Sequence, residues 1–329
     1  MKPAFTFRDM RPTRAGFGEG VLEAARMEPR VVGLGLDITA SVGMNLFAGE
    51  CPDRFFSLGI AEQNAMAVAA GLALCDKIPV LSTYAVFSAF RSADQLRISV
   101  CYNNLHVIVG GAHAGISVGP DGATHQALED LAIVRTLPNM TVLSPCDATQ
   151  ARLATLAAIV DLSGPVYIRY GREAVPDFTS PDLPFIPGQA QLLASGKDVL
   201  IVATGHMVWE AIQAARQVFE EQGIHAAVLN MHTLKPIDKD TLIVLARECG
   251  TVVTAEEHQV TGGLGSAVAE VLATHCPLPV ERVGMPDIFG ESGPPEQLMQ
   301  KYGLDSQGIV HAIHRAMARK TSGAILASY

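Results

Sequence analysis

The segment Leu105–Leu143 reads LHVIVGGAHAGISVGPDGATHQALEDLAIVRTLPNMTVL and contains one complete strand–helix–strand unit. Residues Leu105–Gly110 form a short, valine-rich apolar run, which predicts a buried strand. Residues Gln126–Arg135 have helical periodicity, and Thr141–Leu143 predicts the next strand. Because a helix between two strands is the building unit of parallel sheets, this segment predicts an α/β fold.

Strand-like and helix-like segments alternate along the rest of the chain as well. In the first part, apolar runs predict strands and longer periodic segments predict helices: strands Arg30–Leu36, Pro79–Thr83 and Val166–Arg169, and helices Ile60–Cys75, Ala89–Val100 and Ala148–Val160. In the second part the same patterns predict strands Val199–Ala203, Ala226–Asn230 and Val252–Ala255, and helices Met207–Gln222 and Gly263–Ala273. This order predicts two doubly wound α/β domains, each with a parallel sheet covered by helices on both faces.

A break in this alternation predicts the boundary between the two domains. From Val175 to Lys197 the chain carries four prolines and shows little helical periodicity. Segments of this kind commonly link domains. We therefore expect a first domain at residues 1–174, a linker at 175–197 and a second domain at 198–329.

The composition argues against several classes of function. The net charge is −9 and no run of lysine or arginine occurs, so we expect no nucleic-acid partner and no acidic membrane surface. No stretch approaches the ~18 apolar residues of a membrane span, and we expect a cytoplasmic protein. The six cysteines are scattered without a C-x-x-C pair, which predicts neither a zinc site nor a disulfide framework.

The first candidate site is the start of the helix that contains Glu62. In open parallel sheets, ligands bind beyond the carboxyl ends of the strands, so the loops and helix starts after strands carry the candidate residues. Glu62 stands in the first turn of an otherwise almost wholly apolar helix, which predicts a helix buried on most sides. A buried carboxylate needs a partner. The alternative is that Glu62 only complements the helix dipole.

Two further loops concentrate unusual residues. Tyr84, Phe87 and Phe90 recur at every third position after a strand, a spacing that suits core packing as well as ring binding. The loop His113–Gln126 combines two histidines, an aspartate and several glycines. A merely solvated loop needs no such set of titratable groups, so this loop is a candidate site.

At these loops the sequence resembles the carboxyl-terminal half of transketolase, and the likeness covers almost the whole chain. Residues Asp53–Asn64 (DRFFSLGIAEQN) resemble the family's cofactor-activating segment, and Asp121–Gln126 (DGATHQ) with Leu137–Met140 (LPNM) resembles its substrate loop. Ala203–Gly205 and Leu234–Asp238 resemble the third transketolase domain. On these ordered matches the chain is identified as a member of the family, in the form of a split enzyme.

The resemblance implies thiamine diphosphate as the cofactor. Glu62 would hydrogen-bond the aminopyrimidine ring of the cofactor and favour its imino tautomer, and Tyr84, Phe87 and Phe90 would pack that ring. Phe90 stands where tyrosine is commoner in the family, so one hydroxyl contact is in question. Asp37 matches a position near the cofactor.

The resemblance also implies a site for sugars. His113 and His125 would contact hydroxyl groups of a donor ketose and move protons, and Asp121 would bind a substrate hydroxyl. Three further residues match positions that hold a sugar phosphate: Arg14, Ser41 and Arg169. For the two arginines, the alternative is a surface ion pair.

Two departures from the family affect this sugar site. Pro120 stands where many transketolases carry glutamate. The segment Arg169–Arg172 (RYGR) leans toward the related deoxyxylulose-phosphate synthases, so Arg172 could share or replace the role of Arg169.

A motif that binds the cofactor's diphosphate is missing. Thiamine enzymes hold the diphosphate through a divalent metal, Mg or Ca, with a G-D-G segment, and this sequence contains none. The chain also begins with Met1 and lacks the domain that precedes this half in the family. We therefore expect a partner, the amino-terminal transketolase subunit, to bring the diphosphate and metal site into a heterotetramer with a large apolar interface.

Other functions remain open at this point. The β subunit of the first component of a 2-oxoacid dehydrogenase shares the length, the domain order and the activating glutamate, although the Asp121–His125 loop favours sugar chemistry. A non-catalytic regulatory subunit is the second alternative. The segment Thr261–Ser266 could cradle an anion at a helix start, but a tight turn is the favoured interpretation and we assign it no catalytic role.

Overall fold

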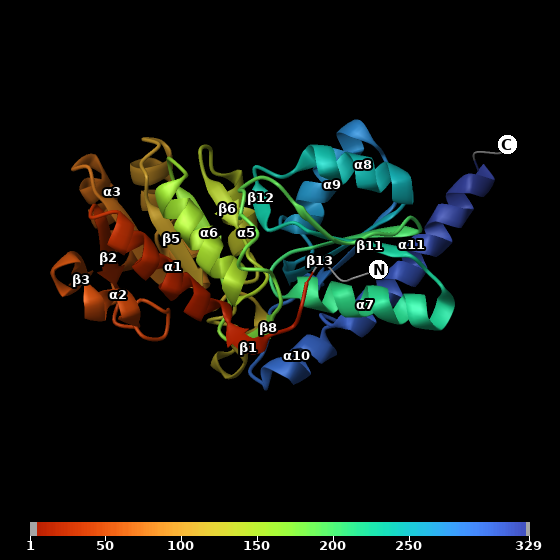
Figure 1. The fold of residues 1–329 in the computed structure, drawn as a ribbon, viewed down its shortest axis with the longest axis horizontal. Coiled ribbons are helices and arrows are strands. Elements are labelled where there is room, and N and C mark those ends of the chain that lie inside the picture. The colour runs from red at the N-terminus through yellow and green to blue at the C-terminus, as the bar shows by residue number, and fades with distance from the viewer. Residues whose placement is uncertain (1–4, 327–329) are drawn as a thin grey trace.

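The computed structural model describes residues 5–326 as two α/β units that lie side by side (Figure 1). The first four residues of the predicted first domain and the last three of the second lie outside the described residues. One sheet has seven strands in the order β12-β6-β7-β5-β4-β2-β3, and the other has five in the order β14-β13-β10-β11-β9. The predicted α/β class, with two largely parallel sheets, is therefore confirmed.

The first sheet is built from strands that are mostly buried. Its parallel strands are β2 (Val31–Gly35), β3 (Phe55–Ser57), β4 (Ile78–Tyr84), β5 (Ile108–Ala112), β6 (Thr141–Leu143) and β7 (Val166–Arg169). Its helices are α1 (Thr13–Met27), α2 (Asn45–Glu50), α3 (Glu62–Leu74), α5 (Asp130–Thr136) and α6 (Ala148–Val160). Strands β2 and β5 are buried at every position, which explains why the sequence shows continuous apolar runs rather than alternation.

The second sheet follows the same pattern. Strands β10 (Val199–Ala203), β11 (Ala226–Asn230), β13 (Val252–Gln259) and β14 (Val280–Met285) are parallel, and β9 (Gln191–Ala194) is antiparallel at one edge. The helices of this part are α7 (Met207–Gln222), α8 (Lys239–Cys249), α9 (Leu264–His275), α10 (Pro295–Lys301) and α11 (Ser306–Leu326). Gly223 caps the C-terminus of α7, and its φ of 70° is the left-handed conformation common at this position.

Three short strands lie where the sequence predicted none, and one of them connects the two parts. Strand β12 (Thr233–Lys235) comes from the second part but pairs antiparallel with β6 at the edge of the first sheet. Within the expected linker, β8 (Ala174–Asp177) pairs with β1 (Asp9–Pro12), and β9 joins the second sheet. The predicted domain limits stay predictions, but the expected linker is paired strand at both of its ends.

Some predicted helices have different bounds. The helix predicted at Ala89–Val100 is instead a short α4 (Ala93–Gln95) between two π-helical turns, Phe87–Arg91 and Leu96–Cys101. The Ser92 hydroxyl donates to the carbonyl of Ser88 at 2.8 Å, a back-bond that commonly distorts helices. Helix α5 begins four residues later than predicted, at Asp130.

The exposure of α3 differs from the prediction. Ile60, which precedes the helix, and Leu74, at its end, are each 73% exposed, and Ala67 and Gly71 between them are also exposed. Only one face of the helix packs on the core, through Ala65, Met66, Ala69 and Ala70. The prediction that α3 is buried on most sides is therefore wrong for the single chain, because its apolar outer face has no cover within the described residues.

No helix among residues 5–326 is both long enough and apolar enough to cross a membrane.

Candidate functional site

Glu62 is buried at the N-terminus of α3, with a charged partner. Its side chain is 6% exposed, and Nη1 of Arg91 lies 3.4 Å from Oε1 and 3.5 Å from Oε2. The residues around Glu62 line a cavity of about 430 Å³, formed by Ile60–Asn64 and Arg91. A carboxylate at the wall of such a cavity can accept a hydrogen bond from a bound ring, and Arg91 keeps its charge balanced.

The aromatic residues after β4 form a stack that reaches both loop histidines. The rings of Tyr84 and Phe87 stack with centroids 5.8 Å apart, and Tyr84 also stacks on His113 at 4.4 Å. The ring of His125 meets Tyr84 and Phe87 edge-on at 5.7 and 5.4 Å. The Arg91 guanidinium lies over the Phe87 ring, 3.8 Å from its centroid. The stack thus connects the surroundings of Glu62 with the histidine loop.

His113 is held as a neutral base. Its Nε2 lies 3.0 Å from the carbonyl of Ser41, and because a carbonyl oxygen only accepts, Nε2 carries the hydrogen. Burial lowers the pKa of His113 to about 4, and the charges of Arg14 and Arg172 add to this effect. The Nδ1 atom is buried and has no hydrogen-bond partner within residues 5–326. A ligand hydroxyl could therefore donate to it.

We expect the buried histidines to make stability depend on pH. Burial lowers the pKa of His113 and of His232 from 6.5 to about 4, so the unfolded chain binds protons in this range that the folded chain does not. The free energy of unfolding should fall as the pH drops below 6.5 and stop responding to these groups near 4, by up to about 1.4 kcal/mol per pH unit for each histidine. Urea unfolding of the wild type and of His232→Gln at pH 7, 6 and 5 measures this.

The variant His232→Gln should have the shallower pH dependence, because it removes one of the two groups. The matched control is His314→Gln. His314 is exposed, and its Nε2 lies 2.9 Å from Oε1 of Gln222. Equal slopes for the wild type and His232→Gln would contradict the prediction.

Polar residues gather beside His113. The Arg14 guanidinium donates to the carbonyl of Ser41 at 3.1 Å, and the Ser41 hydroxyl lies 3.5 Å from that of Tyr84. Asp121 forms an ion pair with Arg172 at 3.3 Å. A cavity of about 280 Å³ borders Arg14, and the Glu19 carboxylate also lines it. The Arg14 guanidinium is a donor suited to an anionic group.

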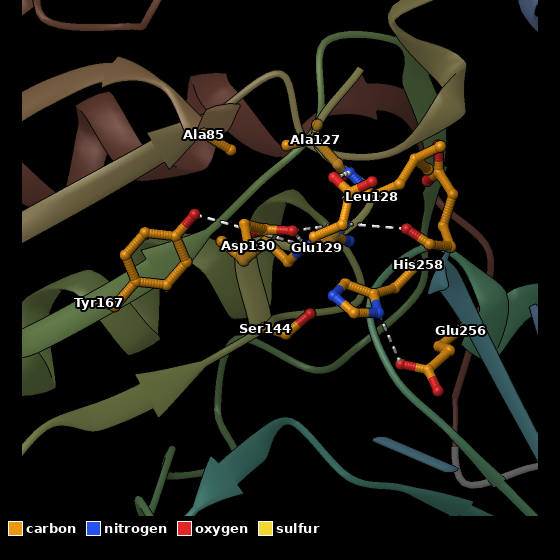
Figure 2. A network of polar contacts seen from close by, with 12 residues as sticks. Ala85, Ala127, Leu128, Glu129, Asp130, Ser144, Tyr167, Glu256 and His258 are labelled. Carbon is orange, nitrogen blue, oxygen red and sulfur yellow. Dashed lines mark hydrogen bonds and ion pairs between the residues drawn. The ribbon is translucent and has the colours of Figure 1, made fainter. Parts of the chain in front are cut away.

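Arg169 lies in a buried network instead. Its Nε and Nη2 donate to the carboxylate of Asp130, at 3.0–3.2 Å, and Nη2 also donates to the carbonyl of Glu257 at 2.8 Å. The Tyr167 hydroxyl donates to the same carboxylate at 2.8 Å, and Figure 2 shows these two side chains facing each other. Arg169 is thus in an ion pair, but a buried one rather than the surface pair considered from the sequence. Arg172 is the arginine of this segment that meets Asp121.

The structure joins most, but not all, of the predicted site residues. Seven of them belong to one continuous set of contacts. Arg91, which was not predicted, connects Glu62 to the stack of Phe87, Tyr84, His113 and His125. His113 then contacts the carbonyl of Ser41, to which Arg14 also donates. Asp37 has a positive φ of 65° and accepts a hydrogen bond from Ser57 at 3.3 Å, on a separate exposed loop. Phe90 is 47% exposed and faces outward. Asp121 reaches the site through the loop that it shares with both histidines and through its ion pair with Arg172, whose charge acts on His113.

Arg91 was missed by the sequence analysis. It is the fourth residue after Phe87, which places both on one side of a helical turn, so the spacing offered a weak signal.

Within residues 5–326, no group of three histidine, cysteine, aspartate or glutamate side chains could hold a metal ion.

Comparisons with known proteins agree with this architecture. Residues 9–177 match the family described as Transketolase, pyrimidine binding domain, and residues 188–309 match Transketolase, C-terminal domain. The chain is 43% identical over 300 residues to the 6-deoxy-6-sulfo-D-fructose transketolase subunit SqwH of Clostridium sp. (strain MSTE9), covering 91% of this chain and 92% of that protein. It is 39% identical over 302 residues to an apulose-4-phosphate transketolase subunit of Phocaeicola vulgatus, covering 92% of this chain and 96% of that protein.

A solved structure supports the same placement. The protein described as "Split gene transketolase, inactive beta4 tetramer" superposes with a TM-score of 0.87 at 46% identity, over 95% of this chain and all of that one. The pyrimidine-binding part and the C-terminal part of the sequence, in this order, thus match subunits of split transketolases. The chain belongs to the transketolase family, as a split-transketolase subunit that combines the pyrimidine-binding and C-terminal domains.

Proposed function

We propose that this chain is the cofactor-activating subunit of a thiamine-diphosphate-dependent enzyme that transfers a two-carbon ketol unit from a ketose to an aldose. The observation that carries the proposal is the buried Glu62 carboxylate, connected through Arg91 and Phe87 to a stack that contains both loop histidines. Such a set can orient a flat heterocycle and, at its far end, a polyhydroxylated substrate.

The residues of the site fit the ring of the cofactor. Glu62 would accept a hydrogen bond from the aminopyrimidine and hold it in its reactive tautomer, while Tyr84 and Phe87 would pack its faces. Thiamine diphosphate, when bound, supplies the electron sink that carries the transferred unit. Because Arg91 and the aminopyrimidine would both bind the Glu62 carboxylate, Arg91 would have to move away or share the carboxylate oxygens with the ring.

The histidine loop would handle the sugar. The unpartnered Nδ1 of His113 can accept a hydrogen bond from a substrate hydroxyl, and its low pKa keeps it neutral at pH 7. His125 would contact a second hydroxyl, and Asp121 a third. Arg14 and Ser41 would hold a phosphate or other anionic end of the sugar, and we assign the second cation to Arg172 because the donors of Arg169 are engaged by Asp130.

We also propose that a partner subunit completes the site. The outer face of α3 and its neighbourhood expose Ile60, Leu74, Ile98 and Tyr102, an apolar surface suited to a protein interface. The amino-terminal transketolase subunit would cover it and bring the divalent metal, Mg or Ca, with the diphosphate site, in a heterotetramer. The description of the solved relative as an inactive tetramer of β chains supports self-association and dependence on a partner.

Reconstitution tests the proposal. The chain, its amino-terminal partner and the complex are each assayed with thiamine diphosphate, Mg²⁺, an aldose acceptor and either a ketose phosphate or a ketose sulfonate as donor. We expect turnover only in the complex. Decarboxylation of pyruvate without ketol transfer, or full turnover by this chain alone, would contradict it.

A further inference from the structure

The loop that carries His113, Asp121 and His125 rests on a carboxylate from the second sheet. Glu257, in β13, is 3% exposed, and its Oε1 accepts the backbone N–H of Ser117 at 2.6 Å. The loop passes directly over this carboxylate at Gly115, which has φ of 89°, and a Cβ there would lie 2.2 Å from Oε1. Glycine is therefore needed for the loop to lie this close to Glu257.

The Glu257 carboxylate is charged and fixed in place. Burial raises its pKa, but His206, Arg169 and the N–H of Ser117 more than offset this and leave the pKa below its usual value. Nδ1 of His206 lies 3.5 Å from Oε2, and Arg169 donates to the backbone carbonyl of Glu257 at 2.8 Å. The bond to Ser117 is thus charge-assisted, one of the stronger kinds in proteins.

A second anchor holds the other end of the loop. The side-chain amide of Gln126 donates to the carbonyls of Ile116, at 3.2 Å, and of Glu291, at 2.9 Å. Glu291 belongs to the turn before α10, in the second part of the chain. Gly122 packs against Ser292 of the same turn, where a Cβ would lie 2.5 Å from the hydroxyl oxygen. The substrate loop is therefore held at both ends from the C-terminal domain.

The backbone of His113 shows why such anchoring matters. Its φ of 52° is left-handed, a conformation that costs a non-glycine residue of the order of 1–3 kcal/mol and persists only when neighbouring contacts enforce it. Ser117 lies four residues further along the same loop. Ala114 and Gly115 are also held, by backbone N–H bonds to the carbonyls of Tyr170 and Ala127. Releasing Ser117 from Glu257 removes one of these supports, so the imidazole would be held less firmly over Tyr84.

We propose that Glu257 is a positioning residue for the ketol transfer, through which the C-terminal domain sets the place of His113 in the substrate site. Glu257 would act on the substrate site through its bond to Ser117. The role in catalysis rests on the proposed function, whereas the anchoring of the loop does not.

The test compares Glu257→Ala with Glu257→Gln in the reconstituted complex. A displacement near 1 Å can lower a rate about 10²-fold, so we expect kcat/KM for the donor ketose to fall by about that factor in Glu257→Ala. Glu257→Gln keeps an oxygen acceptor for Ser117 and should recover to within about fivefold of the wild type. The apparent affinity for thiamine diphosphate should change less than about threefold, because the alanine variant leaves Glu62 in place.

Hydrogen–deuterium exchange on the chain alone gives a readout that does not need turnover. In Glu257→Ala the amides of residues 115–119 should exchange at least about tenfold faster, while those of β4 and β10 stay unchanged. The matched control is Glu256→Ala, because the neighbouring buried Glu256 accepts the N–H groups of Leu264 and Gly265 at 2.6 and 2.7 Å and caps α9 instead. Its loop exchange should match the wild type.

If Glu257→Ala does not fold, Gly290→Ala provides the second variant, since its Cβ would lie 2.0 Å from Oε1 of Gln126 and displace the second anchor. It should show the same local change in exchange and the same loss in kcat/KM. An inactive wild-type complex would refute the proposed function and leave the exchange test standing. Wild-type kcat/KM in Glu257→Ala, or exchange that rises equally throughout the chain, would overturn the positioning role.

Discussion

Glu62→Ala is expected to lower turnover of the reconstituted complex by about 10²- to 10⁴-fold, the range over which a positioned proton-transfer group contributes. The loss should appear in kcat rather than in the KM for either sugar, because the carboxylate faces the proposed ring site and not the histidine loop. Steady-state assays with saturating thiamine diphosphate measure this. The variant should still form the complex, since the apolar surface at Ile60 and Leu74 is unaltered.

A matched carboxylate separates this effect from a general loss of charge. Glu248, exposed on α8 and remote from α3, gives the control Glu248→Ala, which should retain wild-type turnover. Glu62→Gln should resemble the alanine variant, because an amide does not share a proton with the ring as a carboxyl does. Full turnover in either Glu62 variant, with the complex intact, would contradict the assignment.

The second large effect is on stability. Asp130→Ala should lower the free energy of unfolding by about 3–5 kcal/mol, because it removes the carboxylate that pairs with the buried Arg169 guanidinium. It also removes the acceptor of the Tyr167 hydroxyl, which is fully buried. Urea unfolding at pH 7, followed by far-UV circular dichroism, measures the change.

An exposed ion pair provides the comparison for Asp130. Glu220 pairs with Arg216 one helical turn away on α7, at 2.7 Å, and both side chains are more than half exposed. Glu220→Ala should cost less than about 0.5 kcal/mol. The double variant Asp130→Leu with Arg169→Met should recover much of the lost stability, as apolar replacements of buried pairs often do. A loss below about 1 kcal/mol in Asp130→Ala would show that the pair contributes little.

The sequence predicted the regular elements well where local patterns decide them. Strand β10 and helices α6 and α7 have the predicted bounds, because a buried apolar run and an amphipathic period both show in a few residues. Strands β8 and β12 are only four and three residues long and pair with strands far away in the sequence. Such pairing leaves no local periodicity, so it could not be predicted.

The same distinction holds for the site. The motifs around Glu62, His113 and His125 predicted residues that the fold does bring into contact with one aromatic stack. The orientation of Arg169 depends on Asp130, which lies 39 residues away and carries no motif of its own. The exposure of the outer face of α3 could not be predicted, because an apolar helix has the same sequence pattern whether its own core or another protein covers it.

Strand β12 makes the two halves of this polypeptide interdependent. A fragment cut at the predicted linker would leave β6 as a bare edge, with free N–H and C=O groups open to any extended segment. Such a fragment would tend to aggregate, and the remaining piece would lose the support for its own β12. Engineering that shuffles these domains between relatives therefore has to carry Thr233–Lys235 along with the first sheet.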